Sequence, residues 1–249
     1  MVSKFKDIVS VGSLHKDYTE TAFGISMNMV WVDGGMFATG CKKDIQHVSV
    51  DGFYIGELEV TQGQWKNVFG TTVFQQRDKA DPQWPMVGVG DDYPMYYVNW
   101  NEAMKFCQLL SHKTGKIYTL PTEVQWEYAA RGGKCNADTK YAGSNNIEDV
   151  AWYTDNSEGI THECGTKHNN ALGIYDMSGN VWEWCNDWYR YDGYSNDAYN
   201  RQDFEPGYYR VKRGGSWGRD AYGCRVDYRG YSSPYNRDCF VGFRVVCIP

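Results

Sequence analysis

Residues 120–133 read LPTEVQWEYAARGG and predict a short helix with a defined start and end. Thr122 followed by Gln125 forms a capping box, in which each side chain binds a backbone N–H of the other residue. The glycine pair at 132–133 ends the helix. The buried side of this helix is expected to hold Trp126 and Ala129 or Ala130.

Two further helices are predicted upstream. Asn101 is expected to cap a helix that ends at Gly115. Its apolar residues repeat at the helical spacing i, i+3, i+4 and i+7, and they are Ala103, Phe106, Cys107 and Leu110. Thr61 is expected to cap a shorter helix that buries Trp65 and Phe69.

Alternating apolar and polar residues predict strands elsewhere. This pattern predicts that residues 29–40 form a hairpin around a Gly-Gly turn. Residues 47–60 show the same alternation, with a turn at Asp51-Gly52. The stretches RVKRGGSW (210–217) and GFRVVCI (242–248) predict two closing strands near the end of the chain.

The 249 residues are expected to form an N-terminal extension, 1–28, and one domain, 29–249. The net charge of −6 and the absence of a basic run argue against nucleic acid as a partner. No apolar run is long enough for a membrane span, and the first residues lack the apolar stretch of a signal peptide. We therefore expect a cytoplasmic protein, or one displayed on a phage particle or cell surface through a partner.

The eight cysteines form no CxxC pair or other tight metal spacing. We interpret most of them as small buried hydrophobic residues in a reducing compartment. Cys239 is expected to be exposed.

Residues 213–244 contain two groups of positions that differ in composition. One group of positions, the frame set, has the composition of a rigid scaffold; it consists of Arg213, Gly214, Gly215, Ser216, Trp217, Ala221, Cys224, Arg225, Tyr228, Arg229, Pro234, Asn236, Arg237, Gly242, Phe243 and Arg244. The positions between them form the variable set, which consists of Gly218, Arg219, Asp220, Tyr222, Gly223, Asp227, Gly230, Tyr231, Ser232, Ser233, Tyr235, Asp238, Cys239, Phe240 and Val241.

The variable set has a composition that a codon argument explains. Lys, Glu, Gln, Trp and Met supply 52 of the 249 residues, yet none of them occurs from residue 218 to the end of the sequence. Randomising only the adenines of an AAC or AAT codon cannot produce any of these five residues. All 15 residues of the variable set are among those that it can produce. The alternative is a loop-rich closing segment that has drifted in sequence.

Several stretches, in order, resemble the formylglycine-generating enzyme (sulfatase-modifying factor) family. They are VWVDGGMFATG, FYIGELEVTQGQW, LPTEVQWEYAARGG, NALGIYDMSGNVWEW and RVKRGGSW followed by GFR. The resemblance implies a single α/β (α+β), mostly irregular domain with a C-type-lectin-like fold. The segment 213–244 also resembles the variable region of diversity-generating retroelement proteins, whose adenines are miscopied by a reverse transcriptase.

The resemblance to the enzymes implies a copper site built from two cysteines. Their positions fall three and eight residues after Ser216, at Arg219 and Cys224. Because copper(I) prefers two thiolates and only one thiol is present, we expect no copper and no catalysis. Cys239 could replace the missing thiol only if the loop brought it close.

The resemblance also implies a structural calcium site. Carried over residue by residue, its ligands are the carboxylates of Asp176 and Glu183 and the backbone carbonyls of Gly179 and Val181. In the alternative, Glu183 binds backbone amides, Asp176 caps a turn, and a Lys or Arg separates the two acids.

Tyr, Ser, Gly, Asp and Arg in the variable set are typical of an antibody-like binding surface. We expect this set to be exposed on one face, Trp217 and Phe243 to anchor the segment to the core, and the frame arginines to bind carbonyls or acids. The predicted function is recognition of a protein or surface ligand. The alternatives are a copper-dependent oxidase, its inactive paralogue, and a structural paralogue with a fixed partner.

Overall fold

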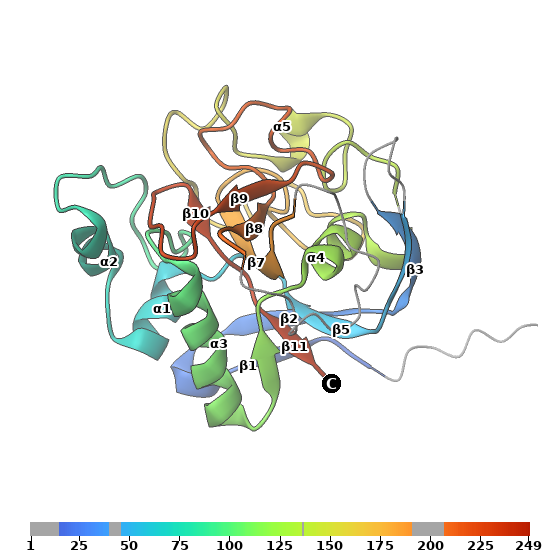
Figure 1. Ribbon diagram of the computed structural model, residues 1–249, viewed down its shortest axis with the longest axis horizontal. Coiled ribbons are helices and arrows are strands. Elements are labelled where there is room, and N and C mark those ends of the chain that lie inside the picture. The colour runs from blue at the N-terminus through green and yellow to red at the C-terminus, as the bar shows by residue number, and fades with distance from the viewer. Residues whose placement is uncertain (1–14, 40–45, 136, 191–206) are drawn as a thin grey trace, which may run out of the picture.

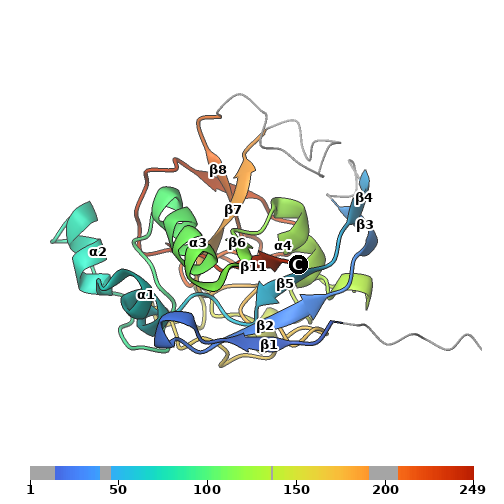
Figure 2. The ribbon, with the colours of Figure 1, turned by 90° about the horizontal axis from the view of Figure 1, so that it is seen from below.

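The protein is described by a computed structural model that covers residues 15–39, 46–135, 137–190 and 207–249. Within these residues, a five-stranded antiparallel sheet has the order β1-β2-β5-β11-β6. Its strands are β1 (Tyr18–Glu20), β2 (Met27–Val32), β5 (Phe53–Gly56), β11 (Val246–Ile248) and β6 (Ile117–Thr119). The strand from the end of the sequence thus lies between two earlier ones (Figure 1, Figure 2).

The predicted hairpins at residues 29–40 and 47–60 are wrong in their pairing. The strand β2 pairs with β1 and β5, whereas β3 (Gly35–Thr39) pairs with β4 (Gln46–Val50). The glycines that suggested turns instead lie where one long antiparallel pairing is interrupted, with β2 and β3 on one side and β5 and β4 on the other. A Cβ on Gly34 would lie 2.8 Å from the backbone nitrogen of Gly52, so only glycine permits this close approach.

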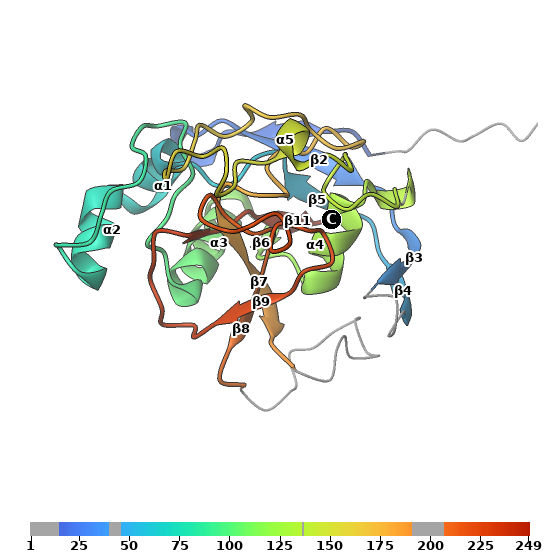
Figure 3. The ribbon, with the colours of Figure 1, turned by 90° about the horizontal axis from the view of Figure 1, so that it is seen from above.

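A second sheet within the described residues has four strands in the order β10-β7-β8-β9. These are β10 (Val241–Gly242), β7 (Trp182–Trp188), β8 (Arg210–Arg213) and β9 (Gly230–Ser232). The strand β10 runs parallel to β7, and the other neighbours are antiparallel. Seen from below and from above, β8 and β9 lie on the opposite side of the molecule from β1 and β2 (Figure 2, Figure 3).

The helices begin at polar caps, as the sequence predicted in most cases. Thr61 and Thr122 form complete capping boxes with Gln64 and Gln125. The long helix is capped by Asn99 rather than by the predicted Asn101, because Asn99 accepts the N–H of the third helical residue. The helices are α1 (Gln62–Phe69), α2 (Val73–Ala80), α3 (Trp100–Thr114), α4 (Glu123–Ala130), α5 (Ile147–Val150) and the short 3₁₀ turns η1 (Ala22–Gly24) and η2 (Gly133–Cys135).

Aromatic rings fill the core between these elements. Trp65 stacks on Phe69 with a centroid distance of 4.2 Å and meets Phe243 edge-on. Trp65 and Phe243 are fully buried, while Phe69 is partly exposed. Trp126 of α4 belongs to a second buried cluster, which packs against β2 and β5. The end of the chain is therefore tied into the core by Phe243.

Residues 15–28 are part of the packed domain. The strand β1 pairs with β2, and Ile25 and Met27 are buried in the core. The second half of the expected extension is therefore packed on the domain, with β1 as the edge strand of the five-stranded sheet. Residues 1–14 of the expected extension lie outside the described residues.

The described cysteines are all free, and five of the seven are buried. Cys135 is exposed and Cys164 is partly exposed, whereas Cys41 lies outside the described residues. Cys239 is buried, contrary to the expectation of exposure, because its side chain packs in the core cluster that contains Tyr97 and Val241.

Candidate binding surface

The segment 213–244 forms a long excursion from the second sheet. It leaves at the end of β8, contributes β9 to the edge of the sheet, and returns through β10 on the other side of β7. In Figure 1 and Figure 3 it is drawn in red tones and lies beside the loops that follow α5. Backbone bonds hold both flanks: Thr154 donates to the Arg219 carbonyl, and Tyr97 donates to the Asp238 carbonyl.

Buried ion pairs fix the two ends of the segment. Arg213 donates to Glu123 at 2.8 Å and to Glu127 at 2.9 Å, and both acids belong to α4. Arg244 donates to both carboxylate oxygens of Glu183 at 2.6 and 2.7 Å. All these side chains are essentially excluded from water, so the charges compensate one another in a low-dielectric interior.

Other frame residues tie the middle of the segment to fixed parts of the fold. Arg229 makes a bidentate contact with Glu123, and Arg237 contacts Glu102 and donates to the carbonyl of Tyr97. The indole N–H of Trp217 donates to the Cys239 carbonyl at 3.0 Å. The frame arginines therefore bind acids and carbonyls, as expected. Within the frame set, nine residues are buried and none is fully exposed.

Most of the variable set lies at the surface. Eleven of its fifteen residues are partly or fully exposed, and four are buried. The fully exposed members are Gly218, Arg219, Asp220, Tyr222, Tyr231 and Tyr235. The partly exposed members are Asp227, Ser232, Ser233, Asp238 and Phe240. The buried members are Gly223, Gly230, Cys239 and Val241. Cys239 and Val241 pack in the core beneath this surface.

The glycines of the two sets differ in what surrounds them. A Cβ on frame residue Gly215 would lie 2.8 Å from the Cα of Cys224, and one on Gly242 would lie 2.4 Å from a carbonyl oxygen. A Cβ on variable residue Gly218 would meet only the ring of Phe240. The same holds for Gly223 and Gly230, whose nearest neighbours are side-chain atoms. Backbone atoms cannot move aside, whereas the partly exposed Phe240 ring beside Gly218 and the exposed side chains beside Gly223 can.

Tyrosines dominate the exposed part of the surface. Tyr222 meets Tyr228 edge-on at 5.5 Å, and the Arg219 guanidinium lies 5.9 Å from the centre of the Tyr228 ring. Tyr231 packs between Tyr189 at 4.4 Å and Tyr209 at 5.1 Å. Neither Tyr189 nor Tyr209 was identified from the sequence, because both lie outside 213–244. Their only sequence signal is their position beside strand-forming residues.

The residues at the copper positions do not form a thiolate pair. Arg219 is exposed, and Cys224 is completely buried, with burial raising the pKa of its thiol to about 12. Cys239 packs in a different buried cluster from Cys224. Cys224 is thus a protonated packing residue whose sulfur points toward the Ser216 carbonyl.

The residues carried over for calcium are arranged around an arginine. Both oxygens of Glu183 are engaged by Arg244, and one also accepts the indole N–H of Trp126 at 2.7 Å. Asp176 accepts the N–H of Gly165 at 2.7 Å, and burial raises its pKa to about 6. The charge of Arg244 also acts on Asp176, where it opposes the effect of burial on the pKa. Both Glu183 oxygens are thus already engaged, and calcium at this site remains a prediction. The carbonyls proposed as the other ligands are those of Gly179 and Val181.

A buried acid that the sequence did not indicate lies beside Asp176. Glu59 accepts the N–H of Val181 at 3.1 Å and the amide of Asn180 at 2.7 Å. Glu59, Cys164 and Asp176 place ligand-type atoms within 4.8 Å of one another. Burial, with repulsion from Asp176 and Glu183, raises the pKa of Glu59 well above its usual value.

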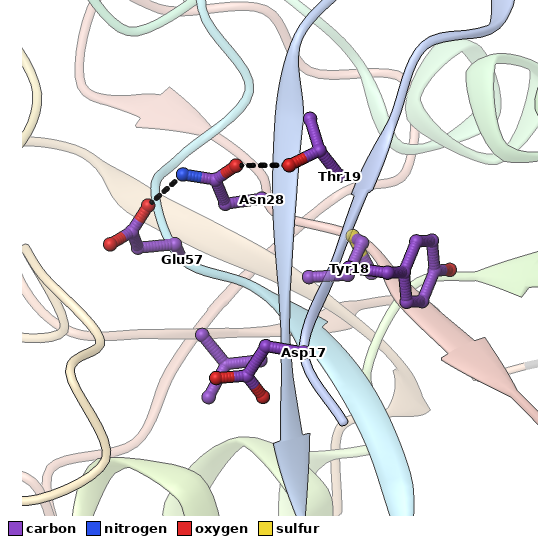
Figure 4. A pocket seen from close by; sticks show the side chains of 7 residues that line it. Asp17, Tyr18, Thr19, Asn28 and Glu57 are labelled. Carbon is purple, nitrogen blue, oxygen red and sulfur yellow. Dashed lines mark hydrogen bonds between the residues drawn. The ribbon is translucent and has the colours of Figure 1, made fainter. Parts of the chain in front are cut away.

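A shallow hollow of about 210 Å³ lies at the β1–β2 edge (Figure 4). Its polar side chains are already bonded to one another. Thr19 donates to Asn28 at 2.9 Å, and Asn28 donates to Glu57 at 2.8 Å. It belongs to the five-stranded sheet, away from the segment 213–244. Among the described helices, none is long and apolar enough to cross a membrane.

Comparison with known proteins places this geometry in a family. Residues 18–248 match the model of the sulfatase-modifying factor enzyme 1-like domain. The structure is similar to that of Treponema denticola variable protein 1, with 31% identity and a TM-score of 0.79 over 94% of this chain and 99% of that one. The sequence is 28% identical to chaperone protein LppX of Paenibacillus barcinonensis over 96% of both chains. It is also 24% identical to the formylglycine-generating enzyme of Bos taurus, over 87% of this chain and 73% of that protein.

These matches confirm the fold expected from the sequence, a mixed α/β domain of the C-type-lectin-like, formylglycine-generating-enzyme type. The match covers nearly all of the chain. The chain therefore belongs to the FGE-sulfatase family of sulfatase-modifying factor enzyme 1-like domains.

Proposed function

We propose that this protein binds a protein or surface ligand through the variable set, and that adenine-directed retroelement mutagenesis diversifies that set. The observation that carries the proposal is the contrast between the two kinds of glycine. A Cβ on the frame glycines Gly215 and Gly242 would collide with backbone atoms, whereas the nearest neighbours of the variable glycines Gly218, Gly223 and Gly230 are side-chain atoms. The likeness to Treponema denticola variable protein 1 supports the same function.

The separation of exposed and buried positions supports this function further. Eleven variable positions reach the surface, and the arginines that hold the segment are paired with acids beneath it. Substitutions at exposed positions usually change the free energy of unfolding by about 0.5 kcal/mol or less. The exposed tyrosines offer large contact areas at a small entropic cost. The platform can therefore exchange its ligand-contacting side chains while it remains folded.

A pair of display libraries tests the proposal. One library randomises the eleven exposed variable positions, and the matched library randomises eleven frame positions. We expect the first library to remain largely folded and to yield clones that bind a purified test protein such as serum albumin. The second library should lose most of its folded clones. Equal losses of folded clones in both libraries would contradict the proposal.

The origin of the diversity has a separate test in the DNA. We expect a near-copy of codons 213–244 close to the gene, with adenines at the codons of the variable set, beside a reverse transcriptase gene. A genome without such a copy would leave a binding surface that is not diversified by this mechanism.

The second candidate function is a copper-dependent oxidase, which the likeness to the formylglycine-generating enzyme of Bos taurus favours. It is tested by adding copper and a cysteine-containing peptide and measuring aldehyde formation. We expect no product, because Arg219 replaces one thiol and Cys224 is buried and protonated. The variant R219C has two thiols at the spacing of the copper ligands, and it is assayed beside the original protein as the matched comparison.

A further inference from the structure

Lys212 lies at the centre of the sheet that carries the candidate binding surface. It is on β8, directly opposite Trp184 of β7 and Gly230 of β9. Residues directly opposite each other in an antiparallel pair share a face, so the Lys212 side chain lies on the Gly230 face of the sheet. Its ammonium is 5.1 Å from the centre of the Trp182 ring. Lys212 precedes residues 213–244, so its codon is outside the diversified segment.

The ammonium of Lys212 has no hydrogen bond or ion pair with any described residue, although the side chain is mostly covered. Burial lowers the pKa of Lys212, with a smaller contribution from Arg219 and an opposing one from Asp238. The neighbouring arginines differ, because Arg213 and Arg229 each contact an acid. A covered charge without a partner costs free energy, which a bound anion would recover.

Three variable positions surround this lysine. A Cβ on Gly230 would lie 3.0 Å from the Lys212 Cγ, so a side chain at position 230 would lie against the stem of the lysine and cover it further. Asp238 and Arg219 act on the pKa of Lys212 in opposite directions: Asp238 raises it and Arg219 lowers it. Asp238 is held in place, since its carboxylate accepts the N–H of Phe240 and the amide of Asn236. Changes at positions 219, 230 and 238 therefore alter the access to Lys212 and the local electrostatic potential.

We propose that Lys212 is a fixed anchor that binds a carboxylate of the protein ligand, and that the residues at positions 219, 230 and 238 tune this contact. The inference rests on the proposed function and names the chemistry of the ligand. A carboxylate fits better than a phosphate, because the nearby Asp238 disfavours a second negative charge on the ligand. The buried Trp182 ring lies beside the ammonium and fixes the position of the lysine from below.

The test uses the full chain labelled with ¹³Cε-lysine and follows the lysine signals by NMR. Acetate is titrated at an ionic strength held constant with sodium chloride, and acetamide serves as the uncharged probe of the same shape. The variant K212Q identifies the Lys212 signal by its loss. We expect this signal to shift and saturate with millimolar acetate and to remain in place with acetamide. Lys66 and Lys105, which are exposed, are the matched controls.

A second variant makes the test independent of any folding defect in K212Q. D238N keeps an oxygen that can accept the Phe240 N–H but removes the competing negative charge. It should tighten acetate binding on the order of threefold, the size of a partly screened charge interaction. Equal, unsaturated shifts of all lysines, or no change with D238N, would overturn the inference. If clones from the display library bind their test protein equally well with and without K212Q, the role of Lys212 is contradicted. The proposed binding surface is still supported in that case.

Discussion

At the scale of single residues, the two kinds of glycine give the sharpest prediction. Gly215 has a φ of 78° and backbone atoms within 3 Å of a Cβ, whereas Gly218 faces only the Phe240 ring. We expect G215A to lower the free energy of unfolding by more than about 2 kcal/mol and G218A to change it by less than about 1 kcal/mol. Urea unfolding followed by tryptophan fluorescence measures both. Similar losses for the two variants would remove the distinction between the sets.

The buried ion pairs make a second prediction for individual residues. R244L leaves the Glu183 carboxylate without its guanidinium in a site that excludes water. We expect a loss of about 3 to 5 kcal/mol in the free energy of unfolding, again from urea titration. The matched control is R225A, whose partner Asp227 is a variable residue near the surface. R225A should cost about 1 kcal/mol or less, and an equal cost would mean that burial is not what makes Arg244 important.

At the scale of elements, the cap of α4 supports the frame indirectly. This helix carries Glu123 and Glu127, which hold Arg213. T122A removes the capping box and should lower the free energy of unfolding by about 1 kcal/mol. T122S keeps the hydroxyl and is expected to behave like the original protein. Thermal unfolding by circular dichroism compares them, and equal melting temperatures for T122A and T122S would contradict the role of the cap.

Elements whose signals are local could be predicted from the sequence, and elements whose partners are distant could not. The caps at Thr61 and Thr122 were correct because a capping box spans only four residues. The pairing of β2 with β5 was missed, since glycines look the same in the sequence whether the chain reverses there or the strand pairing is only interrupted. The position of β11 between β5 and β6 depends on contacts across most of the chain.

The same limit applies to the candidate site. The variable set was chosen from composition, which needs no knowledge of the fold, and eleven of its fifteen residues are at least partly exposed. Its role in binding stays a prediction. Tyr189, Tyr209 and Lys212 were missed, since they join that surface only through the sheet. Cys239 was wrongly predicted to be exposed, because it belongs to the variable set. A codon pattern does not reveal which way a side chain points.

At the scale of the whole molecule, acids with raised pKa values predict how stability depends on pH; they include Asp176 and Glu59, described above, and Asp187. Burial, with a smaller contribution from Glu123, raises the pKa of Asp187 to about 6 from an ordinary value of 3.8. Between these values the folded protein holds more protons than the unfolded chain, so the free energy of unfolding should rise as the pH falls from 7 to 5. We expect a gain of about 1 to 2 kcal/mol, less than the full shift implies, because the residue is partly exposed to water.

Urea unfolding at several pH values measures this dependence, and D187N should weaken it. Asn can still accept the N–H of Glu123 through its side-chain oxygen. D155N, at an exposed position, is the matched control and should keep the full dependence. Below about pH 4 the trend reverses, because Glu123 is held ionised by Arg229 and Arg213 against the effect of burial. A flat profile in the original protein would contradict the buried state of Asp187.

The strand order gives the excursion between β8 and β10 a further property. Both strands flank β7, so the points where the segment leaves and re-enters the sheet are only about 10 Å apart. The residues between β8 and β10 form a closed lobe. Its length and conformation can change without moving the two strands that hold its ends. If the segment is diversified as proposed, the sequence changes are confined to this lobe, and the strands that hold it keep their positions.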